Sequence, residues 1–93
     1  MLNLISADID AYGTKLHYYR TGGDKPPLVI VHGLTDDGLC WTPVAEVLAD
    51  RYDVVMVDTR GHGKSEVPES GYTLATLATE LADFGFWRIF GDR

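Results

Sequence analysis

The stretch from Leu28 to Leu34, with the sequence LVIVHGL, limits the possible folds of this chain more than any other. Its four leading apolar residues are β-branched or leucine, and they lie between Pro26-Pro27 and Gly33. A short apolar run bounded in this way predicts a strand that is buried on both faces of a sheet. A second run of the same kind, Val54–Val57, follows later in the chain and predicts a second buried strand.

A helical pattern lies between these two predicted strands. Thr42 is a suitable N-cap, and Pro43 follows it at the first helical position. The apolar residues that recur at helical spacing are Trp41, Val44, Ala45 and Leu48. Strand, helix and strand together fit one βαβ unit from Leu28 to Asp58, so we expect two parallel strands joined by a right-handed crossover.

Further elements are predicted on both sides of this unit. Two alternating segments, Leu4–Asp10 and Lys15–Arg20, are separated by Ala11-Tyr12-Gly13 and predict an antiparallel hairpin. His17 in the second segment is interpreted as a half-exposed sheet residue without a chemical role. Thr73 is the expected N-cap of a second helix. The expected apolar stripe of that helix consists of Leu74, Leu77, Ala78 and Leu81.

Charge and composition restrict the partners and the compartment. The net charge of the 93 residues is −6 and no Lys/Arg cluster could meet phosphates, so neither nucleic acid nor an anionic membrane is an expected partner. No apolar run is long enough to span a bilayer, and the amino terminus lacks the basic region of a secretory signal. The single cysteine, Cys40, fits a reducing compartment and is interpreted as a core residue. We therefore expect a cytoplasmic protein.

The residues that follow the first apolar run are the best candidates for a functional site. In open α/β sheets, ligands bind just beyond the carboxyl ends of the strands. His32, Gly33 and Leu34 lie at that position in the sequence, and the glycine allows the backbone to approach a ligand closely.

Two motifs, LVIVHGLTDDGLCW and VVMVDTRGHGKS, together resemble the amino-terminal third of an α/β-hydrolase, over roughly Lys15–Leu81. The resemblance implies a partial hydrolase sheet, made of the hairpin, the βαβ unit and the following helix. It implies hydrolysis of an ester, amide or similar bond in a small molecule. The backbone N–H of Leu34 would donate to the oxyanion, with Gly33 allowing close approach and His32 orienting the loop. The turn Asp58–Ser65 would have a structural role.

The catalytic groups that such a hydrolase needs later in its chain are missing from this sequence. Ser6, Ser65 and Ser70 all lack the Gly-x-Ser-x-Gly pattern of a nucleophile elbow. The acid on a later strand and the late histidine that the family needs are absent as well. Residues 84–93 form a divergent aromatic tail to which we assign no fold. We interpret residues 1–93 as the amino-terminal portion of a hydrolase domain that is catalytically incomplete, with truncation as the simplest explanation. The substrate and the nucleophile, serine or aspartate, stay open.

Three other interpretations compete with this one. A metal site of His32, His62 and Asp58 lacks compact ligand spacing, so we expect no metal and no other cofactor. Gly63-Lys64-Ser65 resembles the end of a phosphate-binding loop, but residue 58 is not the required glycine and Pro68 opposes the helix that must follow. A non-catalytic interaction or regulatory protein, which binds a partner through the half-sheet, is the remaining alternative.

The first apolar strand also predicts self-association. In α/β-hydrolases this strand lies between the fourth and fifth strands, and no fifth strand is encoded in this sequence. Leu28–His32 contains no proline, carboxylate, lysine or arginine, the residues that normally discourage pairing between sheet edges. We expect this strand to pair with a second copy of the chain, unless the aromatic segment Phe84–Phe90 covers it.

Overall fold

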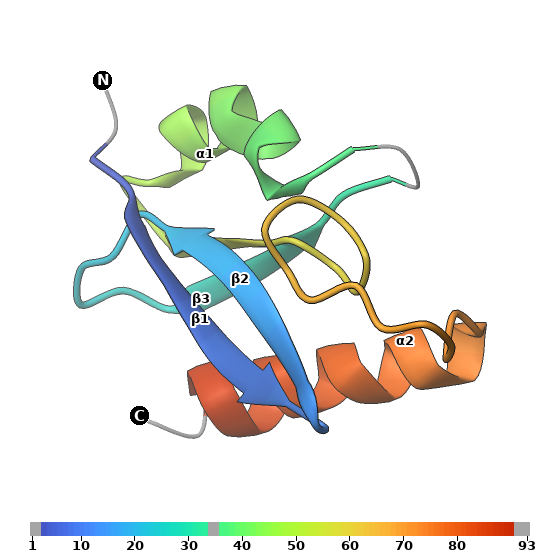
Figure 1. The fold of residues 1–93 in the computed structure, drawn as a ribbon. Coiled ribbons are helices and arrows are strands. Elements are labelled where there is room, and N and C mark those ends of the chain that lie inside the picture. The colour runs from blue at the N-terminus through green and yellow to red at the C-terminus, as the bar shows by residue number, and fades with distance from the viewer. Residues whose placement is uncertain (1–2, 34–35, 91–93) are drawn as a thin grey trace.

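The two predicted parallel strands lie side by side in a four-stranded mixed sheet (Figure 1). The computed structural model describes residues 3–33 and 36–90. In spatial order the strands are β1 (Ile5–Ala11), β2 (Thr14–Arg20), β4 (Asp53–Val57) and β3 (Pro27–Val31). β2 pairs antiparallel with both β1 and β4, whereas β3 pairs parallel with β4. The predicted hairpin and the parallel pair are therefore confirmed.

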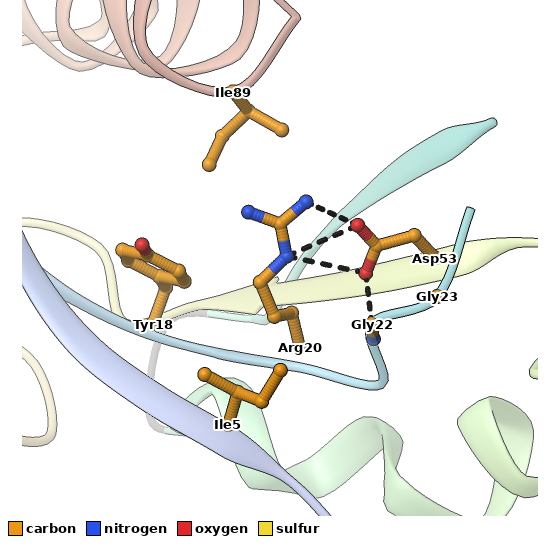
Figure 2. Close-up of a pocket in the computed structure, with 7 residues that line it drawn as sticks. All are labelled: Ile5, Tyr18, Arg20, Gly22, Gly23, Asp53 and Ile89. Carbon is orange, nitrogen blue, oxygen red and sulfur yellow. Dashed lines mark hydrogen bonds and ion pairs between the residues drawn. The ribbon is translucent and has the colours of Figure 1, made fainter. Parts of the chain in front are cut away.

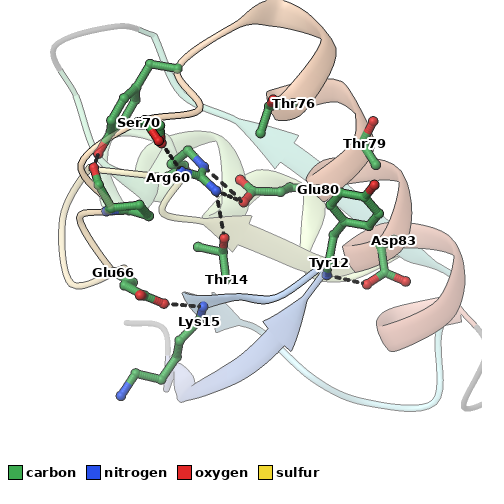
Figure 3. Close-up of polar contacts among 12 residues, drawn as sticks. Tyr12, Thr14, Lys15, Arg60, Glu66, Ser70, Thr76, Thr79, Glu80 and Asp83 are labelled. Carbon is green, nitrogen blue, oxygen red and sulfur yellow. Dashed lines mark hydrogen bonds and ion pairs between the residues drawn. The ribbon is translucent and has the colours of Figure 1, made fainter.

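The hairpin turn depends on two residues in the left-handed region. Tyr12 has a φ of 48° and Gly13 a φ of 84°, as in the tight turns whose twist matches that of the flanking strands. The Tyr12 N–H also donates to Oδ2 of Asp83 at 2.7 Å, which holds the turn against the carboxyl-terminal helix (Figure 3). His17 is only 8% exposed, so the prediction of a half-exposed histidine was wrong. Its Nδ1 lies 2.6 Å from Oδ1 of Asp8, across the hairpin.

The first helix begins one residue earlier than the sequence pattern predicts. A 3₁₀ turn, η1 (Gly38–Trp41), precedes α1 (Thr42–Leu48), and the Asp37 carboxylate accepts the Leu39 N–H to begin that turn. Thr42 is therefore already helical and is not the N-cap, and its hydroxyl donates to the Leu39 carbonyl at 2.7 Å. Of the predicted apolar stripe, Ala45 is buried but Val44 is 38% exposed.

The second helix begins where Thr73 predicts, but it presents a different face to the sheet. The Thr73 hydroxyl accepts the Thr76 N–H at 3.1 Å and caps α2 (Leu74–Ala82), which continues into a π-helical segment, η2 (Asp83–Phe90). Leu74 is 86% exposed and Ala78 is also exposed, so half of the predicted stripe was wrong. The inward positions are instead Leu77, Glu80, Leu81 and Phe84.

The helices cover opposite faces of the sheet, with α1 on one side and α2 with η2 on the other (Figure 1). Each face has its own apolar cluster, and β4 supplies residues to both. Val55 and Val57 pack with Leu16 and Phe84 on the α2 side, whereas Val54 and Met56 pack with Tyr19 and Ala45 on the α1 side.

β3 differs from the prediction of a strand buried on both faces. Its first four residues are only half-buried, and Val31 is 41% exposed. The reason is topological, because β3 is at the edge of the sheet and pairs only with β4 among the described strands. An apolar run therefore indicated a strand here, but not its burial.

A buried ion pair joins the turn after β4 to α2. Arg60 donates to Glu80 Oε2 through Nε at 3.0 Å and lies 2.9 Å from it through Nη2 (Figure 3). The same guanidinium bonds the Thr14 hydroxyl at 2.9 Å and the Ser70 carbonyl. Glu80 is only 1% exposed, so this pairing explains why a glutamate occupies the inward face of α2.

Candidate functional site

The candidate site lies at the carboxyl ends of the two parallel strands, β3 and β4. A cavity of about 180 Å³ opens there between the strand ends and α2. Its lining consists of Val31, His32, Gly33, Thr59, His62, Leu77 and Leu81. Two of the three predicted site residues, His32 and Gly33, thus lie on its wall. The third, Leu34, lies outside the described residues.

His32 is buried and bonded through both ring nitrogens. Its Nε2 accepts the backbone N–H of Thr59 at 3.0 Å. Because a backbone N–H can only donate, Nε2 carries no proton and Nδ1 must carry it. Nδ1 then donates to the Gly33 carbonyl at 2.6 Å. The same carbonyl accepts the Asp36 N–H at 3.3 Å. His32 therefore joins the loop after β3 to the loop after β4.

A second histidine lies beside the first. The ring centroids of His32 and His62 are 4.9 Å apart, and the Thr59 hydroxyl lies between them, 3.1 Å from His32 Nε2 and 3.3 Å from His62 Nδ1. His62 Nδ1 also lies 3.0 Å from the Arg60 carbonyl. Within residues 3–33 and 36–90, no three histidine, cysteine, aspartate or glutamate side chains gather as metal ligands.

Asp58 organises the loops behind the site and does not face the cavity. It is completely buried, and its two carboxylate oxygens accept the N–H groups of Gly38 at 2.7 Å and Lys64 at 2.9 Å. A Cβ at Gly63 would lie 2.3 Å from Asp58 Oδ2, so only glycine fits. The turn that resembled a phosphate-binding loop is thus wrapped around a carboxylate, which excludes a phosphate from that position.

Ser65 has a structural role, in agreement with its unsuitable sequence context. It is only 5% exposed. Its hydroxyl accepts the His17 N–H at 2.7 Å and donates to the Asp58 carbonyl, which ties the turn after β4 to β2. With both bonds made inside the fold, this hydroxyl does not point at a substrate.

Cys40 is exposed in η1, so its interpretation as a core residue was wrong. Partial desolvation, followed by the charges of Asp36 and Asp37, raises the pKa of its thiol. A reactive cysteine needs a lowered pKa, so this environment does not favour a nucleophile.

A larger cavity, of about 400 Å³, lies at the opposite end of the sheet (Figure 2). Its polar feature is a pair that sequence reasoning missed, Arg20 with the buried Asp53 at the start of β4. Arg20 Nε lies 3.0 and 3.2 Å from the two carboxylate oxygens, and the Gly22 N–H donates to Asp53 Oδ1 at 2.9 Å. The hydrogen bond to Asp53 raises the pKa of Arg20. The two charges neutralise each other, so the carboxyl-end cavity remains the better candidate. The sequence signal that could have indicated this pair is Asp53, an aspartate directly before the apolar run Val54–Val57.

Comparison with known proteins settles the family. The model of the α/β hydrolase fold matches residues 26–92. This chain belongs to the α/β-hydrolase family. The match continues through the aromatic segment that begins at Phe84.

Several curated proteins, two of them named as hydrolases, are similar to this chain in sequence. The 2-(acetamidomethylene)succinate hydrolase of Mesorhizobium japonicum is 36% identical over 63 residues, which are 68% of this chain and 23% of that protein. The soluble epoxide hydrolase of a Corynebacterium strain is 37% identical over 71 residues, 76% of this chain and 24% of the enzyme. A Mycobacterium tuberculosis protein named a probable oxidoreductase is 39% identical over 72 residues, 74% of this chain and 12% of that protein.

Solved structures agree with the fold. An N-formylmaleamic acid deformylase from Pseudomonas putida superposes with a TM-score of 0.81 at 34% identity, covering 86% of this chain and 32% of the enzyme chain. An E-2-(acetamidomethylene)succinate hydrolase reaches a TM-score of 0.84 at 31% identity, covering 96% of this chain and 32% of the enzyme chain. The matched part of the chain thus spans between 12% and 24% of the length of the three curated relatives. In the described part of the chain, no helix has both the length and the apolar character needed to cross a membrane.

Proposed function

We propose that this chain supplies the oxyanion loop of a hydrolase that cleaves an ester, amide or similar bond in a small molecule. The observation that carries the proposal is the His32 ring, which holds the Gly33 carbonyl at 2.6 Å from one nitrogen and the Thr59 N–H at 3.0 Å from the other. A catalytic donor must be fixed before the reaction, because a donor that has to reorient gives up part of its stabilisation.

The proposed donor is the backbone N–H of Leu34, as the family resemblance implies, and this residue lies outside the described residues. The support comes from the residue before it. His32 and Asp36 both hold the Gly33 carbonyl, which belongs to the same peptide unit as the proposed donor. Gly33 also leaves open space, because a Cβ on it would meet only Asp36 Oδ2, at 3.6 Å.

The relatives support hydrolysis as the reaction but leave the substrate open. The names of the similar proteins include hydrolases of an acetamido compound and of epoxides. In either case negative charge develops on an oxygen, which a fixed N–H can stabilise. Residues 1–93 contain no nucleophile elbow, so we propose activity only for a protein that also contains the nucleophile, acid and histidine.

The first test uses the 93-residue chain alone. We expect no hydrolysis of p-nitrophenyl esters and no labelling by a fluorophosphonate, because loss of a nucleophile or its base costs about 10⁶ in turnover. Stoichiometric, saturable labelling of Ser65 or Ser70 would contradict this expectation.

The second test joins the chain to the remaining part of a similar hydrolase, such as the Mesorhizobium enzyme, and measures ester hydrolysis. Gly33→Val should lower kcat by about 10²–10³ with a smaller change in KM, because the branched side chain crowds the position of the oxyanion. Gly33→Ala is the matched control, since its Cβ makes only an ordinary contact within the fold. We expect it to keep the fold and to lose less turnover. Unchanged kcat in Gly33→Val would remove the loop from the mechanism.

A further inference from the structure

Thr59 contacts the ring of His32 through two different donors. Its backbone N–H lies 3.0 Å from His32 Nε2, and its hydroxyl oxygen lies 3.1 Å from the same nitrogen. Thr59 is only 8% exposed, so both contacts are made inside the fold. The backbone donor would be present with any residue except proline at this position, whereas only threonine or serine adds a hydroxyl on so short a side chain. The hydroxyl is therefore the part of this contact that depends on the side chain.

The direction of the hydroxyl proton follows from the groups on either side of it. His62 Nδ1 lies 3.0 Å from the Arg60 carbonyl, which can only accept, so this nitrogen carries a proton. It cannot accept the Thr59 proton, although it lies 3.3 Å from the hydroxyl oxygen. His32 Nε2 carries no proton and can accept it. The Thr59 hydroxyl thus donates to His32, and its lone pair faces the N–H of His62.

These contacts hold His32 in one tautomer. With two donors directed at Nε2, the proton of the neutral ring is placed on Nδ1, which donates to the Gly33 carbonyl at 2.6 Å. In free histidine the neutral ring favours the other tautomer, so the fold must supply the difference through hydrogen bonds. If the proton moved to Nε2, both Thr59 donors would face an N–H and the Gly33 carbonyl would lose its ring partner.

We propose that Thr59 is a positioning residue of the oxyanion loop, because its hydroxyl selects the His32 tautomer that holds the Gly33 carbonyl. This role rests on the proposed function of that loop. The hydrogen bonds from His62 through Thr59 and His32 to Gly33 all point the same way, and hydrogen bonds in such a chain polarise and strengthen one another. Loss of the hydroxyl should therefore weaken the bond that holds the Gly33 carbonyl, although Thr59 does not touch that carbonyl.

The kinetic test compares two variants in the joined hydrolase. Thr59→Val keeps the shape of the side chain and the backbone N–H but removes the hydroxyl, whereas Thr59→Ser keeps the hydroxyl. We expect Thr59→Val to lower kcat about 3–10-fold with a smaller change in KM, as for the loss of one hydrogen bond, and Thr59→Ser to retain most of kcat. Thr79→Val is the matched control, because it removes a hydroxyl that bonds only the Ala75 carbonyl on an exposed face of α2.

Nuclear magnetic resonance of the 93-residue chain measures the tautomer directly. The ¹⁵N chemical shifts of an imidazole distinguish its protonated nitrogen from its unprotonated one, and the chain has three histidines to assign. We expect the proton on His32 Nδ1 in the unchanged chain and in Thr59→Ser. In Thr59→Val we expect a measurable shift of the population toward a proton on Nε2.

The outcomes separate this proposal from the proposed function. A proton on His32 Nε2 in the unchanged chain, or an unaltered tautomer in Thr59→Val, would overturn the proposal. Equal losses of kcat in Thr59→Val and Thr59→Ser would also overturn it, because the hydroxyl would then not be the group that matters. If Gly33→Val lowers kcat while Thr59→Val matches Thr79→Val, the loop keeps its function and only the role of Thr59 is wrong. If Gly33→Val leaves kcat unchanged, both are wrong.

Discussion

β3 and β4 are neighbouring parallel strands of five residues with similar apolar sequences, yet they have different environments. Every residue of β4 is buried, and its side chains pack alternately into the two apolar clusters. β3 is half-buried along most of its length and exposed at Val31. The difference arises from position, because among the described strands β4 has a neighbour on each side and β3 has a neighbour on one side.

The loops that follow these strands repeat the contrast. Asp58 after β4 is completely buried and accepts two backbone N–H groups from separate loops. His32 after β3 is anchored on one side by Thr59, which itself follows β4. β4 and the loop after it are therefore buried and hold the surrounding loops in place. β3 carries the candidate site at the edge of the sheet. Stability effects should be largest at β4 and its loop.

The largest effect is expected from Asp58→Ala. The variant leaves the N–H groups of Gly38 and Lys64 without their carboxylate partner, and hydrogen bonds to a charged group are worth about 1.5–3 kcal/mol each. We expect a loss of about 3–6 kcal/mol in the free energy of unfolding, enough to unfold much of a small domain. Urea denaturation measures it, with the exposed Asp50→Ala as control. A loss no larger than that of Asp50→Ala would mean that the hydrogen bonds of Asp58 do not stabilise the fold more than an exposed aspartate does.

The most direct comparison of the strands uses a registered pair of identical residues. Val29 in β3 lies opposite Val55 in β4, so the same truncation can be made on both sides of one ladder position. Val55→Ala should cost about 2–3 kcal/mol, because the residue is fully buried, and Val29→Ala about 1 kcal/mol. Equal losses in urea denaturation would mean that β3 is as well covered as β4.

The sequence predicted the elements well because these are set by local patterns. The hairpin, the two parallel strands and the Thr73 cap all follow from short-range preferences that the fold keeps. His32 and Gly33 were found as wall residues of the candidate site because strand ends in an α/β sheet have a known geometry.

The sequence failed wherever a distant partner decides which side of an element faces inward. Leu74 matched the helical stripe but is exposed, whereas Glu80 is buried because Arg60 reaches it from the turn after β4. Nothing in the local pattern indicates a pairing between residues 60 and 80. The half-burial of β3 and the exposure of Cys40 have the same origin, since burial depends on what lies beyond the element.

The smallest expected effect is a pH dependence of the free energy of unfolding, caused by the buried Tyr19 beside β4. Tyr19 lies opposite Met56, and burial, followed by the charges of Asp58 and Asp37, raises its pKa above the ordinary 10.0. As pH rises past that value, the unfolded chain loses this proton before the folded chain does, so stability falls with rising pH. Below that pH the contribution is fully present.

Tyr19→Phe should therefore weaken the loss of stability between neutral and strongly alkaline pH, measured by urea denaturation at several pH values. Tyr12→Phe is the control, because Tyr12 is 66% exposed on the hairpin turn. An equal change in the two variants would assign the alkaline loss to tyrosines in general and not to the environment beside β4.

The central position of β4 also has a consequence for the order of events as the chain is synthesised. β1 and β2 can pair as soon as they emerge, but the strand that joins them to β3 comes last of the four. Until Asp53–Val57 has been made, the inner edge of the hairpin and both edges of β3 stand open together. Strand edges that wait for a later partner are exposed to other chains during that interval. The residue order of this sheet therefore makes the nascent chain most vulnerable to aggregation just before its most protected strand appears.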